Sequence, residues 1–146
     1  MKARFLMLGL YSVAMAFVEA AVVVYLRSIY SPGSLTALTR LPLLIYRVEL
    51  FREAATILMI VAVGYLAFTR LRYRIIAFLW VFAIWDLLYY VFLRLILGWP
   101  SGLGATDVLF LIPVPWISPV WLPVATSTIV LCVATYLFVR ERDLLS

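Results

Sequence analysis

The sequence contains no histidine and a single cysteine, Cys132, which lies within an apolar run. Without histidine, the chain cannot ligate haem through imidazole, form the common zinc hydrolase sites, or use an imidazole base for serine or cysteine catalysis. One cysteine excludes an intramolecular disulfide, a Cys-x-x-Cys redox pair and a thiolate metal cluster. A hard divalent cation held by carboxylates is the metal site that remains, and nearby arginines disfavour it. We therefore expect no metal site, and the sequence leaves the identity of any cofactor unknown.

Charged residues are also scarce. They make up 13% of the 146 residues, whereas 67% are hydrophobic, and the mean hydropathy is +1.14. A water-soluble domain of this length could not cover such a composition with polar surface. The sequence therefore indicates an integral membrane protein, and residues 1–146 are short enough to form one domain.

Four apolar runs are each long enough to cross a bilayer, which takes roughly 20 helical residues. The predicted spans cover residues 5–26, 48–68, 75–97 and 121–139. The basic stretch Thr69-Arg70-Leu71-Arg72 makes a short turn between the second and third spans. These features predict an all-α bundle of four transmembrane helices.

The segment before the last span is rich in proline and tryptophan. Its prolines lie at Pro113, Pro115, Pro119 and Pro123. Such spacing excludes a regular helix between residues 113 and 119. We therefore expect an interfacial or re-entrant segment, with Trp99, Trp116 and Trp121 anchored at the level of the lipid headgroups.

The basic residues predict the orientation, because lysine and arginine near helix ends stay in the cytoplasm. Seven lie on one side of the predicted spans: Lys2, Arg4, Arg70, Arg72, Arg74, Arg140 and Arg142. Arg27, Arg40 and Arg47 lie on the other side. We expect a multi-pass protein of the cell (inner) membrane with both termini in the cytoplasm. The net charge of +5 then reflects contacts with anionic lipid, and no nucleic-acid partner is expected.

Several ionisable and polar residues fall within or beside the predicted spans, towards the outer leaflet. They are Glu19, Glu49, Arg52, Glu53, Asp86, Tyr89, Tyr90 and Arg94. One unpaired charge at the bilayer centre costs about 2.5 to 3.5 kcal/mol, and a large apolar residue returns only about 0.3 to 0.6 kcal/mol. The charged groups should therefore meet inside the bundle. Spacings of three and four place Arg52 and Glu53 on one helix face with Glu49, and Asp86, Tyr90 and Arg94 on another.

Three sequence blocks resemble a family of small uncharacterised prokaryotic four-helix integral membrane proteins. They are VELFREAA at 48–55, WDLLYY at 85–90 and DVLFLIPVPW at 107–116. The resemblance implies the four-helix fold and no activity. It adds Asp107 and Trp116 to the candidate site residues.

The sequence leaves several roles open for this polar cluster. Buried Glu/Arg pairs can serve only to set how helices pack. The interpretation that we favour is a non-catalytic membrane protein that binds a lipid-like or small polar ligand, or a partner membrane subunit. The alternatives are a membrane enzyme using two of Glu19, Glu53 and Asp86 as acid and base, and an ion-translocating protein. Four helices make a thin pore, so ion translocation would require self-oligomerisation.

Overall fold

The computed structural model describes residues 2–30 and 41–144. Its four helices are α1 (Lys2–Tyr30), α2 (Leu43–Ala67), α3 (Leu71–Leu97) and α4 (Trp121–Leu144). Each contains a stretch long and apolar enough to cross a membrane, which confirms the predicted helical bundle. Arg40, expected on the outer side, lies outside the described residues.

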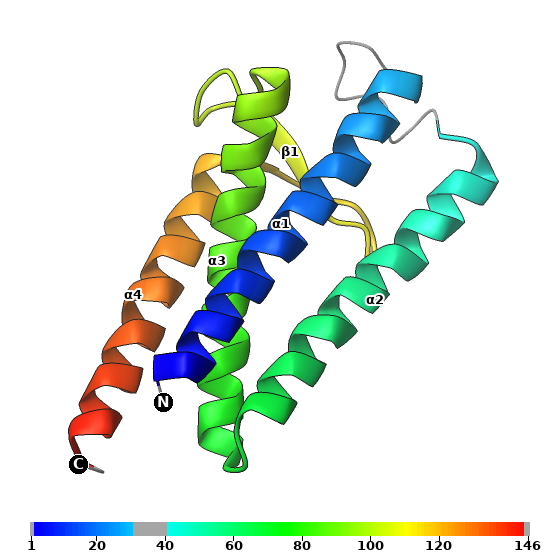
Figure 1. Cartoon of the computed structure of the whole chain (residues 1–146). Helices are drawn as coiled ribbons and strands as arrows, with labels where there is room; N and C mark the ends of the chain where they lie inside the picture. Colours follow the sequence, from blue (N-terminus) through cyan, green and yellow to red (C-terminus); the bar gives the residue numbers. More distant parts are fainter. Residues whose placement is uncertain (1, 31–40, 145–146) are drawn as a thin grey trace.

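The helices run in alternating directions, so both termini and the α2–α3 turn lie at one end of the bundle (Figure 1). We call this the terminal end, and the opposite end the hairpin end. Helix α3 packs against each of the other three, more extensively against α1 and α4 than against α2. The approach of α2 to α3 is close at Gly64, where an added Cβ would lie 3.2 Å from the carbonyl oxygen of Arg74. A glycine here therefore lets the two backbones meet.

The hydrophobic core lies towards the terminal end. Leu8 of α1, Phe68 just after α2, Ile76 of α3 and Phe138 of α4 are buried within one cluster. Phe5 packs edge to face on Phe138, with the ring centroids 4.4 Å apart. Apolar side chains therefore fill the terminal half of the bundle, and the polar side chains of the spans lie in the hairpin half.

The hairpin end is covered by two antiparallel strands, β1 (Thr106–Phe110) and β2 (Trp116–Pro119). Asp107 is paired with Ser118, and the register shifts between Val108 and Phe110. The segment is non-helical, as its prolines predict, but its two strands are not expected from an all-α fold. A two-stranded sheet tolerates proline because every position lies on an edge strand.

Candidate functional site

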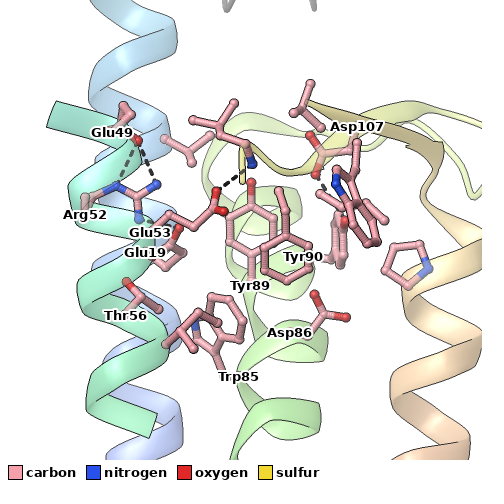
Figure 2. Close-up of a pocket in the computed structure, with 18 of the residues that line it drawn as sticks. Glu19, Glu49, Arg52, Glu53, Thr56, Trp85, Asp86, Tyr89, Tyr90 and Asp107 are labelled. Atoms are coloured by element: carbon pink, nitrogen blue, oxygen red, sulfur yellow. Dashed lines mark hydrogen bonds and ion pairs between the residues drawn. The ribbon is translucent and has the colours of Figure 1, made fainter. Parts of the chain in front are cut away.

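A cavity of about 390 Å³ lies at the hairpin end of the bundle, between the helices and the strands (Figure 2). Side chains of all four helices and of both strands line it. Five of the seven acidic residues of the chain are among them: Glu19, Glu49, Glu53, Asp86 and Asp107. The remaining two, Glu141 and Asp143, are near the carboxyl terminus. The acidic residues of the spans are therefore gathered around one space.

Arg52 of α2 links two of these carboxylates. Its Nη1 lies 2.6 Å from Oε1 of Glu19 on α1, and its Nε donates to Oε2 of Glu49 at 2.8 Å. The side chain of Glu49 is 7% exposed and that of Arg52 is 24% exposed. One guanidinium thus compensates two carboxylates and joins α1 to α2. Charge-assisted hydrogen bonds of this kind are stronger than neutral ones.

Glu53, one residue further along α2, has a different set of partners. The main-chain N–H of Leu111 donates to its Oε2 at 2.8 Å, and that of Ile112 donates to its Oε1 at 3.1 Å. These two residues follow β1, where the chain turns towards β2. Each carboxylate oxygen of Glu53 accepts from one backbone donor. These two hydrogen bonds link the tip of the hairpin to α2.

Asp107 on β1 is the acid at the hairpin side of the cavity. Tyr90 Oη donates to its Oδ2 at 3.1 Å, and Nη2 of Arg27 lies 3.7 Å from its Oδ1. The guanidinium of Arg27 also stacks over Trp99, 3.9 Å from the ring centroid. Burial raises the pKa of Asp107, and the charge of Arg27, the backbone N–H of Val108 and the Tyr90 hydroxyl oppose this rise.

Asp86 on α3 differs from the other four acids. Ser127 of α4 donates its hydroxyl to Oδ2 at 2.7 Å, and no ion pair to Asp86 occurs within the described residues. The preceding residue, Trp85, is 7% exposed, and its buried indole Nε1 has no hydrogen-bond partner among residues 2–30 and 41–144. An unmet buried donor costs about 1–3 kcal/mol, so such a group is uncommon in a folded protein.

The structure brings nine of the ten predicted site residues together around the cavity. The lining comprises Glu19, Glu49, Arg52, Glu53, Asp86, Tyr89, Tyr90, Asp107 and Trp116. Arg94 is the exception: it is exposed, and its Nη1 donates to the carbonyl oxygens of Gly98 at 2.6 Å and Pro100 at 2.7 Å. The expectation that Arg94 meets the other charged groups inside the bundle is therefore wrong. Its long side chain instead binds carbonyl groups at and beyond the end of α3.

Two polar residues that bond to acids of the cavity, Arg27 and Ser127, are missing from the predicted site residues. Its position after the first span predicts only that Arg27 lies on the outer side. Arg27 also lies two helical turns after Glu19, and so on the same face of α1. That spacing could have indicated it. Ser127 has hydroxyl neighbours, Thr126 and Thr128, that bond back to their own helix at Leu122 and Val124. No sequence signal separates Ser127 from them.

Among residues 2–30 and 41–144, no group of three or more His, Cys, Asp or Glu side chains could hold a metal ion. Comparison with protein families, curated proteins and solved structures gave no match. Inferences about function therefore depend on the cavity itself.

Proposed function

We propose that this protein is a multi-pass membrane protein that binds a small, largely apolar ligand with a polar group in the cavity at the hairpin end. The observation that carries the proposal is the concentration of five acidic side chains around a space of about 390 Å³. Ligand pockets in proteins commonly have volumes of about 300 to 1,000 Å³, with mostly apolar walls and a few placed polar groups. Ionisable residues inside a membrane protein commonly mark such a site.

The same proposal includes the orientation. Both termini are cytoplasmic because seven basic residues belong to the terminal end. The cavity then lies in the outer half of the membrane, beneath an interfacial or re-entrant hairpin. Trp116 and Trp121 are 52% and 51% exposed, which supports a position at the headgroup level for the hairpin and the start of α4. Membrane lipids are the partners of the remaining apolar surface, and a second membrane subunit remains an alternative partner.

A carboxylate-dependent role is the second candidate, and Asp86 is the observation that favours it. A carboxyl group with one hydroxyl donor and no cationic partner among the described residues is free to exchange a proton. That property suits an acid or base in a membrane enzyme, or a proton carrier in an oligomer. Ligand binding ranks first because the other four acids are held by arginine, tyrosine or backbone donors.

Native mass spectrometry of protein released from mild detergent tests the binding proposal. Three proteins are compared: the wild type, Thr56→Phe and Thr128→Phe. Thr56 is buried and lines the cavity, so phenylalanine there fills it; Thr128 is exposed and does not line it. We expect a small molecule of constant mass on the wild type and Thr128→Phe, and its loss from Thr56→Phe.

A chain of 16.7 kDa without added mass in all three proteins would contradict the proposal. Added mass that Thr56→Phe retains would place the ligand outside the cavity. A second polypeptide retained in the spectrum would favour the partner-subunit alternative.

A further inference from the structure

We propose that the ligand of this cavity is an organic cation, a protonated amine on an apolar body, and that its nitrogen pairs with Asp86. This inference rests on the proposed function and names the chemistry of the ligand. The ligand also carries a hydrogen-bond acceptor next to the amine. This acceptor receives the hydrogen bond of the Trp85 indole N–H.

The charges around the cavity do not balance. Its lining holds five carboxyl groups and two guanidinium groups, a formal charge of −3 when all are ionised. Arg52 is shared by Glu19 and Glu49, and Arg27 is 3.7 Å from Asp107. In a medium of low dielectric constant this excess attracts a cation and repels an anion.

The hydrogen bonds of the carboxylates indicate which of them receives the cation. Glu53 already accepts one backbone hydrogen bond on each oxygen, from Leu111 and Ile112. Asp86 accepts a single hydrogen bond, from Ser127 to Oδ2. Its Oδ1 accepts none from the part of the chain that the structure describes. An ammonium group, which has three donors, fits that oxygen.

The residue next to Asp86 carries an unpaired donor. Trp85 lines the cavity, and its buried Nε1 has no acceptor in the described part of the chain. Figure 2 shows Trp85 and Asp86 together on the side of the cavity away from Asp107. An oxygen acceptor beside the ammonium group would satisfy this donor, and a simple alkylamine would leave it unmet.

The walls of the cavity are rich in aromatic side chains. Phe82, Trp85, Tyr89, Tyr90, Phe110 and Trp116 all line the cavity. Aromatic faces attract organic cations, and the effect strengthens where water is excluded. The chain already uses this contact nearby, where Arg27 lies over Trp99.

The test uses four probes that share a phenylbutyl body. 1-Amino-4-phenylbutan-2-ol carries the amine and the acceptor, and 4-phenylbutylamine carries the amine alone. 4-Phenylbutane-1,2-diol is the neutral counterpart, and 4-phenylbutyrate is the anion. Binding is measured by isothermal titration calorimetry with the full chain in phosphatidylcholine nanodiscs, and the heat of empty nanodiscs is subtracted.

Wild-type protein should bind the amino alcohol about tenfold or more tightly than the diol, a difference of about 1.4 kcal/mol. Asp86→Asn should remove this preference, and Trp85→Phe should remove the advantage of the amino alcohol over the simple amine. Asp143→Asn and Trp121→Phe make the same two exchanges at residues outside the cavity lining. Both preferences of the wild type should persist in these variants.

The comparison of probes on the wild type does not depend on whether a variant folds. A diol or a phenylbutyrate that binds the wild type as tightly as the amino alcohol would overturn the cation inference. If Thr56→Phe nevertheless blocks those neutral or anionic probes, the cavity still binds ligands and the proposed function stands. If no probe binds the wild type more tightly than Thr56→Phe, both proposals fail. An Asp86→Asn variant that keeps the full preference for the amine would overturn the assignment to Asp86.

Discussion

The carboxylate of Glu53 on α2 accepts a hydrogen bond of 2.8 Å from the main-chain N–H of Leu111, 58 positions later in the chain. We expect Glu53→Gln to lower the free energy of unfolding by about 1–3 kcal/mol, because the amide sets an NH₂ group against a backbone donor. The amides of Leu111 and Ile112 should also exchange hydrogen faster. Hydrogen–deuterium exchange and thermal unfolding in detergent measure both effects, with Glu141→Gln as the control. If the amides of Leu111 and Ile112 exchange at the wild-type rate in Glu53→Gln, Glu53 does not hold the hairpin against α2.

Arg52 compensates Glu19 and Glu49 together, so its loss leaves a buried and a half-buried carboxylate without this cation. We expect Arg52→Gln to destabilise the bundle by about 3 kcal/mol, the lower part of the range for a broken buried pair, because the arginine is partly exposed. Adding Glu19→Gln to that variant should recover part of the loss. Arg47→Gln is the control, since Arg47 is exposed on the same helix. A double variant less stable than Arg52→Gln alone would count against this pairing.

Asp107 should give stability a measurable pH dependence. Burial raises its pKa in the folded protein, so the folded state holds its proton more tightly than the unfolded state does. Its contribution to stability is therefore complete below its ordinary pKa of about 4 and declines as pH rises through the raised value. Asp107→Asn does not titrate, so its stability relative to the wild type should increase over that interval.

Thermal unfolding of Asp107→Asn and the wild type across a pH series measures this difference. Arg27→Gln removes a cation that opposes the rise in pKa, so it should extend the interval to higher pH. A stability difference that is constant with pH, or that changes in the opposite direction, would refute the prediction.

The two helical glycines Gly64 and Gly9 should respond differently to alanine. A Cβ at Gly64 would lie 3.2 Å from the oxygen of Arg74 and 3.4 Å from the nitrogen of Phe78, so the backbones must move apart. A Cβ at Gly9 would lie 3.6 Å from Trp80, an ordinary contact. We expect Gly64→Ala to cost about 1 kcal/mol or more, and Gly9→Ala to gain up to about 1 kcal/mol of helix propensity. Thermal unfolding of the two variants measures this difference. Equal changes in stability would contradict the close approach of α2 to α3 at Gly64.

The spans and most of the cluster could be predicted because both follow from the cost of placing polar groups in hydrocarbon. That cost requires Glu19, Arg52 and Asp86 to face the interior wherever their helices lie. It does not say which groups pair. Pairing depends on the rotation and stagger of neighbouring helices, which hydrophobic periodicity leaves open. Arg52 therefore bonds Glu19 and Glu49, whereas Asp86 bonds Ser127.

The positions of Arg94 and of the hairpin could not be predicted, for different reasons. The spacing of Arg94 from Tyr90 assigns its Cβ to a helix face, but a flexible side chain can extend along the helix to the carbonyl groups beyond its end. The strands are five and four residues long and lie among prolines. Segments so short have no clear alternation of apolar and polar residues, and the hairpin that they form bonds to α2 and α3, which are distant in the sequence.

The grouping of the acids at the hairpin end also determines how the chain responds to a voltage. Five arginines belong to that half by sequence position, Arg27, Arg40, Arg47, Arg52 and Arg94, and they equal in number the five acids around the cavity. The whole net charge of +5 therefore resides at the terminal end. Each elementary charge is worth about 2.3 kcal/mol across 100 mV. In the proposed orientation, a membrane potential that is negative inside holds the terminal end at the cytoplasmic face, while the neutral hairpin half experiences almost no net electrical force.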